Sequence, residues 1–236
     1  MARVKQGLGI RPAFARSASA RSRRSLGGGG DWGLGLRRVS RCAMLMLLAA
    51  SPAFAQQEES GASKFGRVIL GGVAGLGLHE TGHLVANWAF EEKVKIKKVD
   101  YKGIPFFALS HAPDLSPRRE YVVSSAGMWA QYLYSEQILT HHPNLKNEQA
   151  PFRKGMLAFH VVTSLVYSGA AFGKTGPVER DTRGMALSRR INERWIGAMV
   201  LAPALFDMYR YFNPDARWAT WTSRGVKIGS VALVIK

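Results

Sequence analysis

Three residues in a largely apolar stretch have types and spacing that can bind a metal ion and activate a water molecule. His79 and His83 stand four positions apart in the segment HETGH, and Glu80 follows the first histidine directly. On a helix, positions i and i+4 lie on one face, so both imidazoles can reach the same ion. An HExxH helix typically binds zinc, with the glutamate as general base. The ion lowers the pKa of its bound water toward about 7, so the carboxylate can take the proton.

The setting of this motif strengthens the metal prediction. Residues 68–90 are apolar apart from the motif and a few small or polar residues. An ionisable group near the centre of a membrane span costs about 2.5–3.5 kcal/mol or more, so such groups are usually functional. Chelation of a zinc ion offsets that cost. The alternative is that both histidines are structural and pack against neighbouring helices.

A zinc site of this kind needs a third protein ligand, and Asp207 is the candidate. It lies within another long apolar segment, residues 195–212. Helix rise places His79 about 17 Å and Asp207 about 18 Å from the same membrane face. Pro203, four residues earlier, would loosen the helix and let the carboxylate turn to the metal. The alternative for Asp207 is an ion pair with Arg210 at i+3.

Four apolar segments must position these residues, and each is close to the length of a membrane span, about 17–25 residues. They cover residues 68–90, 121–139, 156–172 and 195–212. We therefore expect an all-α membrane fold, a bundle of about four transmembrane helices. A fifth apolar run at 226–235 is short, which leaves a fifth span open. The alternative is a soluble helical domain whose core helices are hydrophobic all round.

The loops between these segments alternate in positive charge. The loops at 91–120 and 173–194 carry seven and six Lys/Arg residues, whereas those at 140–155 and 213–220 carry three and one. Under the positive-inside rule the two rich loops are cytoplasmic, and the first span starts outside. The first rich loop also alternates apolar and polar residues on either side of Lys102-Gly103, which predicts a small cytoplasmic β-hairpin. Its edge strand could pair with an extended peptide.

The N-terminal region has the composition of sequence that is processed or unfolded. Residues 1–55 carry ten Lys/Arg and one acid, a large part of the formal net charge of +17. Residues 37–55 have a basic start, an apolar core and an A-x-A end, as a signal peptide has. Residues 1–36 are rich in Arg, Ser, Gly and Ala and are expected to be disordered or an over-extended start of translation. Residues 56–64 would be a linker, and 65–236 the membrane metalloprotease-like domain.

Cleavage after Ala55 would leave the mature N-terminus outside, in agreement with the loop charges. We therefore expect an integral membrane protein of a bacterial inner membrane. Cys42 is the only cysteine and lies before the cleavage site, so the mature chain would have no thiolate ligand. The basic residues do not form a stripe interleaved with aromatic residues, so no nucleic-acid partner is expected.

Three segments resemble the site-2 protease family of intramembrane zinc metalloproteases. HETGHLVANWAFEEKVKIKKV is similar to the family's HExxH helix and following β-hairpin, RREYVVSSAGMWAQYL to its segment with Ala-Gly, and PALFDMYRYF to its aspartate motif. The resemblance implies zinc held by His79, His83 and Asp207, with Glu80 catalytic. It also implies cleavage of a transmembrane or membrane-associated protein within the lipid bilayer.

At three positions the sequence departs from the family pattern. Met128 replaces a proline, Gln131 an asparagine and Met208 a glycine. Gln131 takes the position of a residue expected to help position the substrate. Two other functions stay open: a membrane zinc protein that has lost peptidase activity and acts as a binding partner, and a soluble secreted zincin-like peptidase.

Two further features bear on helix packing. His160 lies in the middle of the third apolar segment and is expected to hydrogen-bond across helices, with a ligand role as the alternative. Gly71 and Gly75 form a GxxxG pair, which usually indicates a close helix contact and here could also make room beside the metal.

Overall fold

The computed structural model describes residues 60–101, 104–110 and 115–232. Within them lie six helices and one two-stranded sheet. In chain order these are α2 (Gly61–Ala89), β1 (Lys95–Tyr101), β2 (Ile104–Ser110), α3 (Pro117–His141), α4 (Pro151–Gly173), α5 (Asp181–Arg189), α6 (Glu193–Phe212) and α7 (Arg217–Ala232). The expected signal peptide and the segment before it lie outside the described residues. Of the expected linker at 56–64, residues 61–64 lie in the first turn of α2.

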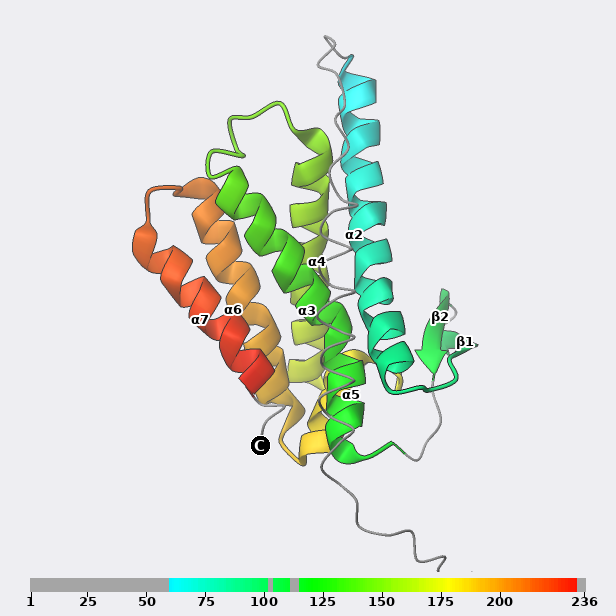
Figure 1. Cartoon of the computed structure of the whole chain (residues 1–236). Coiled ribbons are helices and arrows are strands. Elements are labelled where there is room, and N and C mark those ends of the chain that lie inside the picture. Colours follow the sequence, from blue (N-terminus) through cyan, green and yellow to red (C-terminus); the bar gives the residue numbers. More distant parts are fainter. Residues whose placement is uncertain (1–59, 102–103, 111–114, 233–236) are drawn as a thin grey trace, which may run out of the picture.

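The long helices form an up-and-down bundle (Figure 1). Each of the four apolar segments lies in one of them, α2, α3, α4 and α6, so the prediction of four long helices is confirmed. Helix α7 packs against α6 and begins well before the short apolar run predicted at 226–235. The connections before α3 and α6, which are the basic ones, lie at the same end of the bundle as α5 and the hairpin (Figure 1).

Side-chain caps fix where several of these helices begin. The Ser60 hydroxyl accepts a hydrogen bond from the Ser63 backbone N–H, 3.3 Å away. Ser116 caps α3 in the same way, and Pro117 follows it at a position where no helical N–H is needed. The Asn192 side chain accepts from the backbone of Arg194 at the start of α6. These local signals define the helix starts independently of the tertiary packing.

Glycine allows α2 and α4 to approach closely. A Cβ on Gly71 would overlap the backbone carbonyl oxygen of Phe152, and a Cβ on Gly155 would overlap that of Val68. The predicted close contact at the GxxxG pair is therefore confirmed. Gly71 and Gly75 are both buried against α4, so they make room for that helix and not for a metal ion.

The predicted hairpin is also confirmed. Strand β1 pairs antiparallel with β2, with Lys95 opposite Ser110 and Tyr101 opposite Ile104. The turn residues Lys102 and Gly103 lie outside the described part of the chain. Lys97 Nζ contacts Glu179 Oε1 at 2.6 Å, which ties the hairpin to the segment that leads into α5.

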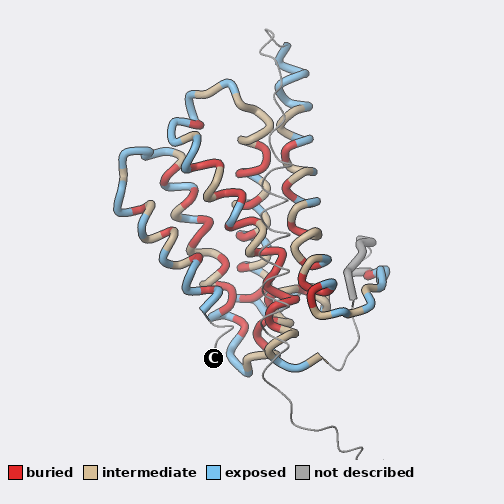
Figure 2. Tube along the Cα trace, viewed as in Figure 1, coloured by how far each residue is buried: buried red, intermediate tan, exposed pale blue. Residues whose placement is uncertain are grey.

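The core of the bundle contains many polar side chains beside the apolar ones. Figure 2 shows the buried positions along the helices. The buried polar side chains on the long helices include His79, His83, Asn87, Ser124, Ser125, Gln131, Ser135, His160, Ser164, Ser168, Asp207, Arg210, Ser223 and Lys227. Among the described helices, α4 alone is long and apolar enough to cross a membrane by length and composition. Hydropathy therefore does not support the expected bundle of four spans, because polar inward residues lower the hydropathy of the other helices.

Candidate metal centre

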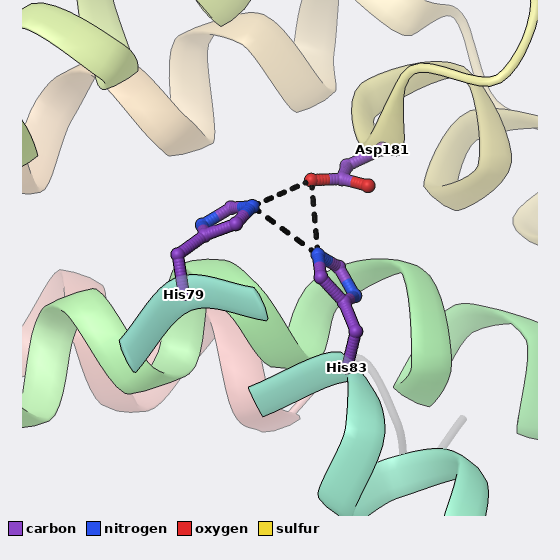
Figure 3. A group of neighbouring side chains, drawn as sticks. All are labelled: His79, His83 and Asp181. Carbon is purple, nitrogen blue, oxygen red and sulfur yellow. Dashed lines mark hydrogen bonds and ion pairs between the residues drawn. The ribbon is translucent and has the colours of Figure 1, made fainter. Parts of the chain in front are cut away.

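Two helices bring three potential metal ligands together at one end of the bundle. His79 and His83 lie one turn apart on α2, and Asp181 is the first residue of α5. The two imidazole Nε2 atoms are 3.2 Å apart. Asp181 Oδ2 lies 3.2 Å from the first and 3.3 Å from the second (Figure 3). These residues form a group that can hold a metal ion.

The hydrogen bond of His83 leaves its Nε2 atom without a proton when the ring is neutral. Its Nδ1–H donates to the backbone carbonyl of Val123, 2.8 Å away. Asp181 Oδ2 is buried and lies 3.2 and 3.3 Å from the two ring nitrogens, so it is hydrogen-bonded to the histidines only where one of these nitrogens carries a proton. A bare ring nitrogen and a carboxylate oxygen 3.3 Å apart repel each other unless a cation or a proton lies between them. This pair of buried acceptors is the observation that fits a bound cation.

Glycine makes the space beside the ligands. A Cβ on Gly127 would lie 2.5 Å from His83 Nε2 and 2.6 Å from His79 Cε1, where a side chain cannot fit. A Cβ on Gly82 would overlap the backbone carbonyl oxygen of Ala126. The Gly of HETGH and the Ala-Gly pair of α3 thus allow α2 and α3 to meet closely at the ligands.

Asp181 is held in place by its two neighbours in sequence. The guanidinium of Arg180 donates two hydrogen bonds of 2.7 Å to the carboxylate of Glu193, the first residue of α6. The Thr182 hydroxyl donates to the same carboxylate at 2.9 Å. All three side chains are buried. Because both flanking residues are anchored to Glu193, the Asp181 carboxylate has little freedom to leave the histidines.

The ionisation of Asp181 reflects this environment. Burial would raise the pKa of its carboxyl group. The charge of His83 and hydrogen bonds from both histidines outweigh burial, and they hold the pKa well below the ordinary value. Asp181 is therefore an anion at neutral pH, the form in which a carboxylate binds a metal ion.

Glu80, the predicted catalytic residue, is partly exposed and lies next to the ligand set. Its carboxylate is close enough to interact electrostatically with His83 and with Tyr167 of α4. The Tyr167 ring lies near that of His79, with 6.1 Å between the ring centroids. Glu80 therefore lies within electrostatic range of the group formed by His79, His83 and Asp181, but it is not a member of that group.

Asp207, the predicted third ligand, lies elsewhere. Its Oδ1 atom accepts hydrogen bonds from the Ser223 hydroxyl at 2.7 Å and Lys227 Nζ at 2.9 Å. Arg210 at i+3 donates to the same oxygen at 3.3 Å, as the alternative to ligation anticipated. The prediction is corrected for a physical reason: two buried cations and a hydroxyl already neutralise this carboxylate. Pro203 does not alter this, because α6 continues through it.

Gln131 also differs from its predicted role in positioning substrate. Its side chain is completely buried between two histidines on neighbouring helices. Nε2 lies 2.8 Å from His79 Nδ1, and Oε1 lies 3.1 Å from His160 Nδ1. It thus contacts the ring of His79, a candidate metal ligand, and its burial leaves no surface for a substrate. His160 makes the interhelical hydrogen bond expected of it and is not one of the three ligands.

Sequence reasoning missed Asp181 because the search for a third ligand covered only the long apolar segments. Asp181 lies in the basic connection between two of them, in VERDTRG. One signal could have located it. The charge pattern puts this connection at the same end as His83, so a carboxylate at the start of a short helix there can reach the histidines.

Comparison of the chain with family models, with curated proteins and with solved structures finds no match.

Proposed function

We propose that this chain is a zinc metalloendopeptidase that acts at a membrane and cleaves a transmembrane or membrane-associated protein. The observation that carries the proposal is the convergence of His79, His83 and Asp181, with Glu80 adjacent, in an HExxH helix. Two imidazoles and one carboxylate are a common zinc ligand set, which leaves a fourth position for water. The resemblance to site-2 proteases supports the same reaction class.

The spacing of the ligand atoms supports zinc in particular. Zn–N and Zn–O bonds are about 2.0–2.2 Å, so two ligands of a tetrahedral ion lie about 3.3–3.6 Å apart. The three ligand atoms of this group are 3.2–3.3 Å from one another. A single ion at their centre fits without rearrangement of α2 or α5.

In the proposed reaction, the zinc ion and the residues of the chain have separate roles. A bound zinc ion would acidify its water and polarise the scissile carbonyl. Glu80 accepts the proton from the attacking water and returns it to the amine that leaves. His79 and His83 are almost fully buried, so bulk water is excluded from the rings. Gly127 keeps the space in front of them open.

The distribution of side chains on α2 supports a lipid environment. Its buried face carries Gly71, Gly75, His79 and His83, whereas large apolar residues point outward. The exposed apolar side chains of α2 are Phe65, Ile69, Leu70, Val73, Leu76, Leu84 and Trp88. Helix α4 exposes Val162, Leu165, Val166 and Phe172. A surface helix of a soluble protein has the opposite arrangement.

We place the metal-bearing end of the bundle on the cytoplasmic side of a bacterial inner membrane, with the start of α2 outside. The positive charge of the connections at that end supports this orientation. An unwound substrate segment could pair with the hairpin, which lies at the same end (Figure 1). The partners are then a membrane protein substrate and the lipid itself.

The test is Glu80→Gln in the purified full chain, loaded with zinc in detergent micelles. We expect unchanged zinc content and about 10²–10⁴-fold slower cleavage of casein and of single-span model peptides. Glu92→Gln, just beyond the end of α2, is the matched control and should cleave as wild type does. Equal cleavage by wild type and Glu80→Gln would overturn the mechanism.

A second function is favoured by the low exposure of the site. The side chains of His79, His83 and Asp181 are only 3%, 9% and 15% exposed. A zinc protein without peptidase activity, acting as a binding partner, would need no substrate access. Stoichiometric zinc with no cleavage of any of these substrates supports this second function over the first.

Membrane fractionation tests the location independently. An integral protein stays in the membrane pellet after a carbonate wash. A soluble, secreted zincin-like peptidase would be released into the supernatant, and that result would overturn the membrane part of the proposal.

A further inference from the structure

A continuous chain of buried polar groups connects the metal group to Asp207, although Asp207 is not a ligand. It runs from His79 Nδ1 to Gln131 over 2.8 Å, and from Gln131 to His160 Nδ1 over 3.1 Å. His160 Nε2 then lies 3.4 Å from Asp207 Oδ2. The chain crosses four elements, α2, α3, α4 and α6, and its last three side chains are completely buried.

The far end of this chain is a firmly held anion. Asp207 accepts hydrogen bonds from Ser223 and Lys227, both on α7. Lys227 also contacts Glu136 of α3 at 3.1 Å. Arg210 contacts Asp207 and Glu136 as well, at 3.3 and 2.6 Å. Because Lys227 and Arg210 keep Asp207 ionised, its carboxylate has no proton to donate and can only accept hydrogen bonds.

The atoms His160 Nε2 and Asp207 Oδ2 favour the opposite orientation of the Gln131 side-chain amide, with its oxygen and nitrogen exchanged. With Gln131 Oε1 toward His160 Nδ1, that nitrogen carries the proton, and Nε2 of the neutral ring is bare. His160 Nε2 is buried without a hydrogen bond to the described residues, and it faces Asp207 Oδ2 at 3.4 Å, an oxygen that also lies 2.8 Å from Lys227 Nζ. Two acceptors therefore face each other, which is costly in a buried site. A positively charged His160 would relieve this, but it would place another cation beside Lys227.

Rotation of the amide by 180° satisfies every group in the chain. His160 Nε2–H then donates to Asp207, and its bare Nδ1 accepts from the Gln131 amide N–H. The Gln131 oxygen accepts from His79 Nδ1–H. His79 is left with a bare Nε2, the form that binds a metal ion.

We propose that Gln131 and His160 are positioning residues. Because Asp207 is an anion, it accepts the His160 Nε2–H, and the hydrogen bonds through His160 and Gln131 then fix His79 in its metal-binding tautomer. The zinc-bound protein has the rotated Gln131 amide. This inference rests on the proposed zinc site, because the tautomer matters only if His79 binds an ion. His83 needs no such chain, since the carbonyl of Val123 fixes its tautomer directly.

Zinc affinity is the first test, measured on the full chain with zinc alone in competition with a chelator. Gln131→Met and His160→Phe keep the volume and remove the hydrogen bonds, and each should weaken zinc binding about 10–100-fold. Ser168→Ala is the matched control: its hydroxyl donates to the Gly197 carbonyl at 2.9 Å in the same core, away from the chain of groups. It should bind zinc as wild type does.

A rescue variant separates positioning from packing. Gln131→Glu keeps an oxygen that accepts from His79 Nδ1–H, so zinc affinity should stay within a few fold of wild type. If Gln131→Glu falls as far as Gln131→Met, the role of Gln131 is packing and the inference is wrong.

Nitrogen-15 NMR of the zinc-loaded chain tests the tautomers directly. We expect the His79 proton on Nδ1 and the His160 proton on Nε2. A His160 proton on Nδ1 with zinc bound would overturn the inference. If wild type binds no zinc, the proposed function fails. If wild type binds zinc and both Gln131→Met and His160→Phe bind it equally well, only the positioning chain fails.

Discussion

Arg180 and Glu193 form a buried two-point ion pair on either side of Asp181, the third member of the group that can hold a metal ion. Both guanidinium–carboxylate contacts are 2.7 Å, and Thr182 adds a third bond to the same carboxylate. Asp181 stands between these two anchored residues and faces the histidines of α2 (Figure 3). The ion pair joins the start of α5 to the start of α6, so the metal group depends on a contact that involves no ligand.

Glu193→Ala should therefore reduce both stability and metal binding. Removing one partner of a buried ion pair costs about 3–5 kcal/mol, because the other charge is left uncompensated. Zinc binding should weaken as well, since Arg180 and Thr182 no longer hold Asp181. Denaturant unfolding and chelator competition measure the two effects. Glu148→Ala removes the more exposed pair with His142 and should cost no more than about 1 kcal/mol.

Replacing each aspartate with asparagine compares Asp181, the carboxylate that lies beside the histidines, with Asp207, the ligand expected from the sequence. Asp181→Asn should weaken zinc binding at least about 100-fold, because a neutral amide is a poor zinc ligand. Asp207→Asn should keep zinc affinity within about tenfold, because its amide oxygen still accepts from His160. It should lower stability, since Lys227 and Arg210 lose a counter-ion. The reverse order of zinc affinities would return Asp207 to the ligand set.

Gly127→Ala should abolish metal binding. The new Cβ would lie 2.5 Å from His83 Nε2, so the rings must move apart or α3 must shift. Gly77→Ala on α2 is the control, because a Cβ there meets nothing within 4 Å. That change should stabilise the helix by about 0.5–1 kcal/mol and leave zinc affinity unchanged. Normal zinc binding by Gly127→Ala would contradict the position of the ion.

The zinc-free protein should lose stability in acid partly through Asp181. Its pKa in the folded protein is below the ordinary value of 3.8, so its contribution is fully present above that value. The contribution is lost as the pH falls through the ordinary value toward the folded-state pKa. The free energy of unfolding of wild type should thus decrease more steeply below about pH 5 than that of Asp181→Asn. Parallel curves for the two proteins would show that the carboxylate makes no such contribution.

The local features of this chain follow from its sequence. The apolar segments predict the four long helices, the alternation around Lys102-Gly103 predicts the hairpin, and the i, i+4 spacing puts His79 and His83 on one face of α2. These features depend on periodicity and on caps such as Ser60 and Ser116, which act over a few residues. Sequence spacing is therefore sufficient to predict them.

Tertiary structure decided which carboxylate lies beside His79 and His83 and which side chains Gln131 contacts. Asp207 and Asp181 are both carboxylates near apolar segments, and nothing local distinguishes a ligand from a partner of Lys227. The difference arises because α7 packs on α6 and supplies Lys227 and Ser223 to Asp207, while Arg180 and Glu193 bring Asp181 to the histidines. Each of these contacts joins separate helices. Such partners depend on how whole elements dock, which residue spacing along the chain does not encode.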